Sequence, residues 1–202
     1  MLKALPLIGI LVLCSILAVA VTATFWPRYE ERFFELGLLG KDKTAEGYFP
    51  NNNSNLALGS QVNWYIYVQN HMVNVENVSV RVKLLNSTMK APDDTKHEPS
   101  PFTPIVEFPL SLPDNDTLLI PFSWSILQTV SQDNSSVIKS LMINGQTFRV
   151  DVKDSNNSLF NMIFELWVFD PLSHEYEFGW ESGEEFSSAS LNMWFRLSSP
   201  AN

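Results

Sequence analysis

The chain has 202 residues and carries 22 acidic against 13 basic side chains, a formal net charge of −9. Because binding to a phosphate backbone requires a basic face, this balance argues against nucleic-acid binding. The single cysteine, Cys14, lies inside an apolar run, so the rest of the chain offers no disulfide and no thiolate metal site. Packing alone must stabilise the fold.

The first predicted element is a membrane anchor. From Ala4 to Trp26 there are 23 residues without a charge, long enough for a helix to cross a hydrocarbon core of about 30 Å. We expect residues 1–27 to form one N-terminal transmembrane helix that contacts membrane lipid through residues 4–26. A cleaved signal peptide is the alternative, because residues 18–23 contain two small-x-small patterns. The length of the run and its terminal aromatic residues favour the retained anchor.

The rest of the chain is expected outside the cytoplasm, in a single-pass topology. Asn-x-Ser/Thr sequons favour an outer face on which glycans can be attached. The alternative is that a composition rich in asparagine and serine produces sequons incidentally. The six candidates for glycosylation are Asn52, Asn77, Asn86, Asn115, Asn134 and Asn156.

Residues 28–60 are interpreted as a leader rich in aromatic and aliphatic side chains. We expect this leader to pack on the outer domain. Two interpretations stay open: residues 28–49 cover the second face of the sandwich, or that face presents aromatic side chains for binding. The apolar leader residues that need burial are Phe33, Phe34, Leu36, Leu38 and Leu39.

Alternation with a period of two dominates after residue 60 and predicts β-strands. The first strand places Val62, Trp64, Ile66 and Val68 on one face. The same pattern predicts strands over 78–84, 118–126 and 148–152, and the last of these follows Asn144-Gly145, a dipeptide that suits a type I′ hairpin turn. The one helical segment expected beyond the anchor is a short turn within 137–142.

The C-terminal part is predicted to contribute two more strands, 160–169 and 191–197, whose apolar side chains face each other across a shared core. The connector between them, 170–188, is interpreted as a long acidic loop. Prolines bracket residues 105–112 and predict an edge strand, because proline cannot donate to a ladder. Residues 51–55 and 89–104 are expected to be exposed loops. Residues 61–202 are therefore predicted to form an all-β, immunoglobulin-like β-sandwich of about seven strands, without the disulfide of antibody domains.

Several motifs occur in a recognisable order. They are Leu38-Leu39-Gly40, Ala45-Glu46-Gly47-Tyr48-Phe49-Pro50, Asn55-Leu56-Ala57-Leu58-Gly59, Val68-Gln69-Asn70-His71 and Leu191-Asn192-Met193-Trp194. This order resembles the domain of unknown function 1616 family, mostly archaeal membrane proteins, over residues 30–85 and more loosely over 160–197. The resemblance implies a membrane location and an all-β fold, and it supplies no catalytic residues.

Residues that could carry chemistry are sparse. The three histidines, His71, His97 and His174, never show the short spacing typical of a zinc site. The acidic connector could supply oxygen ligands to calcium, although a solvated loop is the favoured interpretation. No strained Gly-x-Ser-x-Gly turn and no phosphate-binding glycine loop occurs in the sequence. We therefore expect no enzymatic activity, no cofactor and no metal.

One set of aromatic side chains falls on faces or loops opposite the predicted core. Such a set could bind a glycan or pack against a partner protein. The residues proposed as a partner face are Tyr65, Tyr67, Trp167, Trp180 and Trp194. The leading hypothesis is an accessory, scaffold or interaction subunit that binds a protein partner in a membrane or cell-envelope assembly. A pilin-like filament subunit, with the chain as a homo-oligomer, and a calcium- or glycan-binding surface domain are the alternatives.

Overall fold

The computed structural model describes residue 15 and residues 31–132, 135–154, 159–183 and 185–198. The chain divides into two compact units, residues 1–30 and 31–202, and the description below concerns the second. The predicted transmembrane helix, residues 1–27, lies outside the described residues apart from Ser15, and so do the sequon asparagines 134 and 156. Within the described ranges, no helix has both the length and the apolar character needed to cross a membrane.

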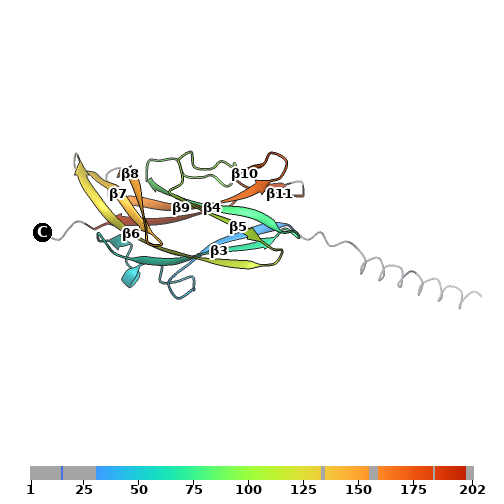
Figure 1. The fold of residues 1–202 in the computed structure, drawn as a ribbon, viewed down its shortest axis with the longest axis horizontal. Coiled ribbons are helices and arrows are strands. Elements are labelled where there is room, and N and C mark those ends of the chain that lie inside the picture. Colours follow the sequence, from blue (N-terminus) through green and yellow to red (C-terminus); the bar gives the residue numbers. More distant parts are fainter. Residues whose placement is uncertain (1–14, 16–30, 133–134, 155–158, 184, 199–202) are drawn as a thin grey trace, which may run out of the picture. The chain divides into compact units, whose positions relative to one another are not determined.

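The second unit is an all-β sandwich of two sheets (Figure 1). The first sheet has the strand order β1-β3-β6-β7-β8, built from β1 (Phe33–Leu39), β3 (Val62–His71), β6 (Thr117–Gln132), β7 (Ser135–Ile143) and β8 (Gln146–Lys153). The second sheet has the order β2-β13-β9-β4-β5, built from β2 (Asn55–Leu56), β13 (Ser190–Leu197), β9 (Leu159–Asp170), β4 (Glu76–Asn86) and β5 (Val106–Leu112). Both sheets are antiparallel apart from the short parallel pairing of β2 with β13.

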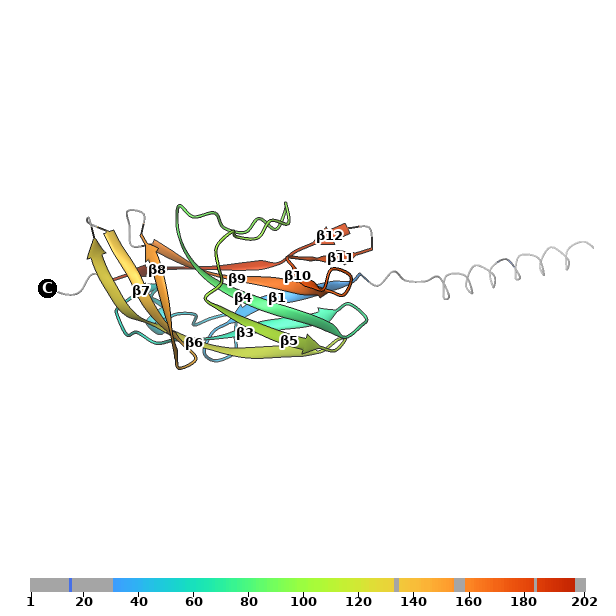
Figure 2. The same ribbon diagram turned by 45° about the horizontal axis from the view of Figure 1, so that its top comes forward.

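Three shorter strands and one helical turn complete the described elements. Strand β10 (Glu175–Glu177) continues the second sheet along β9, and β11 (Trp180–Ser182) pairs with β12 (Glu185–Ser187) in a separate hairpin. Figure 2 shows this hairpin beside β10 at one end of the sandwich. A 3-10 turn, η1 (Pro50–Asn52), lies in the loop before β2.

The core lies between the two sheets, and the residues buried in it confirm the inward faces that were predicted from the alternation in the sequence. The inward side chains of β3, β4, β6 and β9 are almost fully buried, as their period-two patterns predict, apart from Leu118 at the start of β6, which is 38% exposed. Trp64 lies at the centre, with its ring centroid 5.4 Å from that of Trp124 and 6.0 Å from that of Phe164 on the facing sheet. The predicted faces of these strands are therefore correct.

Two local predictions are confirmed by the backbone. Asn144 and Gly145 both have positive φ, 47° and 80°, as a type I′ turn requires, and the Asn144 side chain accepts the N–H of Ser123 at 2.8 Å. Strand β5 lies at the edge of its sheet and pairs only with β4. Pro109 has no backbone N–H to donate, and on the free side of β5 no neighbouring strand among those described needs one.

Several predictions about strands are wrong. The sandwich has more than the seven strands expected, because the leader supplies β1 and β2 and the connector 170–188 supplies β10, β11 and β12. Residues 137–142 belong to β7 rather than to a helical turn. In the pairing with β6, Ser140 lies opposite Gln128 and Ile138 opposite Thr129, so Lys139 is an extra residue in β7. This bulge places Ile138 and Leu141 on the core side, and their separation of three residues imitates helical spacing.

The arrangement of the last strands also differs from the prediction. Strands β9 and β13 are neighbours in one sheet, with Met162 directly opposite Met193, and do not face each other across the core. Alternation alone cannot tell these arrangements apart, since it shows which side chains point inward but not which strands pair.

The leader does not cover a sheet face. Strand β1 joins the edge of the first sheet by pairing with β3, from Phe33 opposite His71 to Leu39 opposite Tyr65. Its Phe34 and Leu38 point into the core, which meets their need for burial. A different segment, described below, covers the outer face of the second sheet.

The turn at Gly145 provides a test of this register. Gly145→Ala places a Cβ at φ 80°, which L-residues tolerate poorly, so we expect the free energy of unfolding to fall by about 1–2 kcal/mol. Urea denaturation measures this loss, with Gln146→Ala on the neighbouring exposed position as the control. Equal stability of the two variants would contradict the positive φ.

Candidate functional site

A buried ion pair lies on the outer face of the second sheet. Lys83 of β4 and Glu165 of β9 both point away from the core, and their Nζ and Oε2 atoms are 2.7 Å apart. Their side chains are only 2% and 0% exposed. A charge withdrawn from water in this way is retained only when it is paired and hydrogen-bonded.

The cover over this pair is a strap, which we define as residues 87–105 between β4 and β5. Ser100 of the strap donates its backbone N–H to Glu165 Oε1 at 2.7 Å and accepts a bond from Lys83 Nζ at its carbonyl oxygen at 2.6 Å. One peptide segment therefore satisfies both charges. The prediction that residues 89–104 form an exposed loop is wrong for this part of the strap.

Trp167 completes the surroundings of the pair. Its indole N–H donates to Glu165 Oε2 at 3.0 Å, and the guanidinium of Arg81 lies 3.8 Å from the centre of its ring. Arg81 in turn lies 3.3 Å from a carboxylate oxygen of Glu107 on β5. Each oxygen of Glu165 thus has at least one donor, so the buried carboxylate has a partner on both sides.

The other end of the strap is attached to the segment around β12 and β13. Asp94 Oδ2 accepts the N–H of Ser190 at 3.1 Å and its hydroxyl at 3.0 Å. His97 Nδ1 lies 3.1 Å from Ser188 Oγ, and the His97 ring packs edge-on against Phe186. The strap is therefore held at two separated points.

The pair His97 and Ser188 does not have the arrangement of a nucleophile and its base. Ser188 Oγ donates its only proton to the carbonyl oxygen of Asp94 at 3.2 Å. His97 Nδ1 must then donate to Ser188 Oγ, whereas a general base would accept from it. The contact therefore anchors the strap and gives no support to hydrolytic chemistry.

The outer face of the first sheet is different in character. Tyr65 and Tyr67 of β3 are half-buried there, flanked by Leu39 of β1 and by Leu119 and Pro121 of β6. These side chains form what we call the tyrosine face, comprising Leu39, Tyr65, Tyr67, Leu119 and Pro121.

Polar contacts fix the two tyrosines in place. The Tyr67 hydroxyl lies 3.1 Å from Glu35 Oε2, and it also bonds to Gln69. Desolvation and this bond to Glu35 raise the pKa of Tyr67, so its phenol stays a neutral donor. The Tyr67 ring lies over Gly37, where a Cβ would be 3.3 Å from ring atom Cδ1, and the Lys43 ammonium lies 5.1 Å from the Tyr65 ring centroid.

The structure does not bring the five aromatic residues of the predicted partner face together. Tyr65 and Tyr67 lie on the outer face of the first sheet, whereas Trp167 and Trp194 lie on that of the second. Trp180 is buried, with its ring 5.2 Å from that of Phe34. The outer faces of the two sheets point in opposite directions. One flat partner could therefore contact either the two tyrosines or the two tryptophans, but not both pairs.

The described sequons differ in how their amides are used. Asn52 and Asn77 are exposed, in η1 and at the start of β4. The Asn86 amide nitrogen, the atom that a glycan would modify, donates to the carbonyl oxygen of Lys153 at 2.7 Å, and that of Asn115 donates to Asp114. Asn52 and Asn77 are therefore the better candidates among those described.

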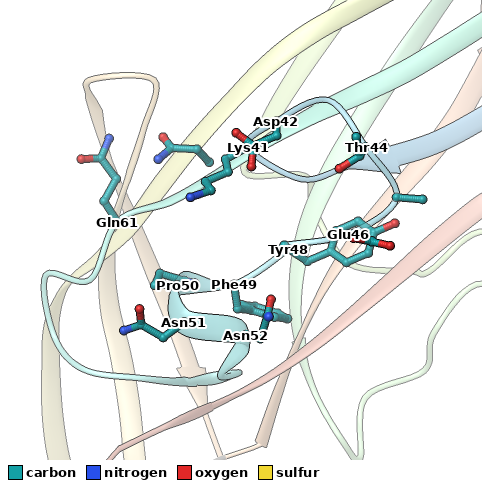
Figure 3. Close-up of a pocket in the computed structure, with 13 residues that line it drawn as sticks. Lys41, Asp42, Thr44, Glu46, Tyr48, Phe49, Pro50, Asn51, Asn52 and Gln61 are labelled. Atoms are coloured by element: carbon teal, nitrogen blue, oxygen red, sulfur yellow. The ribbon is translucent and has the colours of Figure 1, made fainter.

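A pocket of about 780 Å³ lies between the loop after β1 and the start of β3 (Figure 3). Its polar lining side chains, including Lys41, Asp42, Glu46 and Asn51, are exposed. Two lining side chains are hydrogen-bonded: the Tyr48 hydroxyl donates to the carbonyl oxygen of Leu38 at 3.1 Å, and the Gln61 amide donates to Ser123 Oγ at 2.8 Å. The lining is therefore mostly exposed and offers few ordered polar groups to a specific small ligand.

Metal-binding candidates are scattered. Across residues 31–132, 135–154, 159–183 and 185–198, no group of three or more His, Cys, Asp and Glu side chains converges on one point. The histidines are used locally: His71 stacks on Phe33 at 4.5 Å, and His174 lies near Phe169. The calcium hypothesis for the connector 170–188 stays a prediction.

Sequence reasoning missed Lys83 and Glu165, because alternation assigned both to the solvent side of their strands. A signal was present in β9, where residues 160–168 are apolar at nearly every position. Such a run is typical of a strand that is buried on both faces. A lone glutamate within it indicates a paired charge.

Comparisons with known proteins identify no family for this chain. No family model matches the chain, and no curated protein matches it. Among solved structures, the CARDB domain of the PF1109 protein from Pyrococcus furiosus, solved in complex with di-metal ions, has a TM-score of 0.41 at 10% identity. The match covers 84% of this chain and 96% of that one. This similarity is too low to carry an argument about function, and the proposed kinship with the 1616 family stays a prediction.

The buried pair makes a strong prediction for stability. Lys83→Met leaves the Glu165 carboxylate buried without its counter-ion, so we expect the free energy of unfolding to fall by about 3–5 kcal/mol. The matched control is Lys139→Met, since Lys139 Nζ lies 2.8 Å from Asp151 Oδ1 but the pair is largely solvated, at 33% and 73% exposure. The control should lose less than about 1 kcal/mol. Similar losses in urea denaturation would refute the importance of burial.

The strap should also loosen in acid. A bond from Lys96 lowers the pKa of Asp93 below its ordinary value of 3.8, and a bond from Lys90 lowers the pKa of Glu98 below 4.5. Groups with depressed folded-state pKa values stabilise the fold above those ordinary values, and this stabilisation disappears as the pH falls through the depressed ones. Amide protection factors within 87–105 should be constant from about pH 7 to 5 and decrease below about pH 4. Constant protection down to pH 2 would exclude this role for the two carboxylates.

Proposed function

We propose that the protein is a single-pass, membrane-anchored β-sandwich that acts outside the cytoplasm as an accessory or interaction subunit. In this proposal residues 4–26 hold the chain in the membrane and the sandwich binds a protein partner without performing chemistry. The uncharged run of 23 residues supports the anchor, because its length matches a hydrocarbon core.

The observation that carries the proposal is the contrast between the two outer faces. The strap closes part of the second sheet, where Lys83 and Glu165 are buried. The tyrosine face of the first sheet has no such cover among the described residues, although it carries aromatic and aliphatic side chains. Apolar surface of this kind, rimmed by polar residues, is typical of protein interfaces.

The two tyrosine side chains are already ordered in the unbound domain, and this supports a protein partner. The contacts of the Tyr67 hydroxyl with the acceptor oxygens of Glu35 and Gln69, and the close approach of its ring to Gly37, restrict Tyr67 before any partner binds. A side chain that is already ordered loses little conformational entropy on association. Tyrosine also combines a large contact area with a hydrogen-bonding tip, and for this reason it is enriched at interfaces.

A site-specific photo-crosslinker in native membranes tests this proposal. Placed at Tyr65 of the full chain, it should give one adduct with a different protein at a fixed mass. Placed at Trp194, an aromatic residue 43% exposed on the outer face of the second sheet, it should not give that adduct.

The other outcomes identify the competing functions. An adduct between two copies of the chain would favour a filament subunit or homo-oligomer over an accessory subunit. The absence of any protein adduct at Tyr65 would contradict the protein-partner proposal and direct attention to a glycan or another small ligand.

A further inference from the structure

One end of the sandwich collects the loops that lie near the start of β1. Phe33 pairs with His71 at the end of β3, Leu112 at the end of β5 pairs with Glu76 at the start of β4, and β9 ends beside that same start. We call this the entry end; it consists of residues 31–33, 72–75, 113–116 and 171–174. Figure 1 shows β10 and the beginning of the described chain at this end.

Apolar side chains project from the loop tips of the entry end. Leu172, in the turn between β9 and β10, is 91% exposed, and Val73 and Val75, in the loop between β3 and β4, are 47% and 63% exposed. Three large apolar side chains on neighbouring tips are costly to leave in water, since burying one is worth about 1.5–3 kcal/mol. Their exposure therefore indicates that these three side chains contact an apolar environment when the protein functions.

Both tips are held in place by carboxylates behind them. Asp170 accepts the backbone N–H groups of Leu172 and Ser173, each at 2.9 Å. Asp114 accepts the N–H of Val73, also at 2.9 Å. The apolar side chains are thus presented outward on ordered turns.

The backbone at Val73 is a second, independent observation that points to a role for its apolar side chain. Its φ is +70°, a region that a β-branched residue enters only with strain. Asparagine or glycine would fit this backbone more easily. Val73 is exposed, so core packing does not explain why valine occupies the position.

The length of the connecting chain limits how far the start of the described domain can lie from a bilayer that holds residues 4–26. The uncharged run ends at Trp26 and the described domain begins at Glu31, five residues later. Five residues span at most about 18 Å. With residues 4–26 in a bilayer, the first described residue lies within that distance of the lipid interface.

We propose that Val73, Val75 and Leu172 insert into the interfacial region of the bilayer that holds residues 4–26. This inference rests on the proposed membrane anchoring. A lipid surface fits better than a protein, because separate convex tips cannot supply the roughly 800 Å² per partner of a stable protein interface. The carboxylates of Asp114 and Asp170 directly behind the tips limit the insertion to a shallow depth.

Depth-dependent fluorescence quenching tests the inference on the full chain in phosphatidylcholine vesicles. A bimane label is attached through Leu172→Cys in a Cys14→Ala background, which removes the only native cysteine. The matched control is Leu58→Cys, 58% exposed and located before the start of β3, whereas the entry end lies at the end of β3. Lipid-attached nitroxide should quench the label at position 172 at least twofold more than the label at position 58, and aqueous iodide should quench it less.

Equal quenching at the two positions would overturn the inference. Sedimentation after an alkaline carbonate wash separates this failure from failure of the anchor: release from the vesicles overturns the membrane proposal itself, whereas retention with equal quenching overturns only tip insertion. Val73→Asn combined with Val75→Ser should keep the melting temperature and halve the lipid quenching at position 172. Unchanged quenching in that variant would also contradict insertion of the loop.

Discussion

The buried contact between Lys83 and Glu165 is the constraint on which much of the molecule depends. Two opposite charges lie 2.7 Å apart where almost no water reaches them. Their attraction repays the cost of desolvation only if the remaining donors and acceptors are also satisfied. Ser100 and Trp167 supply those partners, so the strap has to stay in place for the sheet beneath it to be stable.

This constraint makes the two outer faces unequal. Strands β4 and β9 are buried on both sides, between the core and the strap, and they form the rigid centre of the second sheet. The first sheet keeps an outer face on which Tyr65 and Tyr67 are ordered but uncovered in the described residues. The proposed partner surface and the proposed lipid-facing tips therefore occupy different parts of one compact unit.

Much of the fold could be predicted because alternation is a local signal. The inward residues of β3, β4 and β6, the turn at Asn144-Gly145 and the proline-marked edge strand β5 all follow from neighbouring residues alone. The bulge in β7 could not be predicted from alternation, because the extra residue Lys139 changes the apparent period between Ile138 and Leu141.

The candidate sites were harder to predict because they depend on distant contacts. Lys83 and Glu165 are 82 positions apart, and only the pairing of β4 with β9 brings them together. The predicted partner face treated five aromatic residues as one surface. Strand pairing divides them between two sheets and buries Trp180, and sequence pattern contains no information about that division.

Exchange of the Ser100 amide hydrogen, measured by NMR in the folded protein, tests the central claim most directly. Its bond to Glu165 Oε1 predicts exchange as slow as that of the Ile105 amide, which donates to the carbonyl oxygen of Val82 at 2.7 Å. Exchange at the rate of an unprotected amide would mean that the strap opens freely. The closed second sheet, and the contrast between the two faces, would then be wrong.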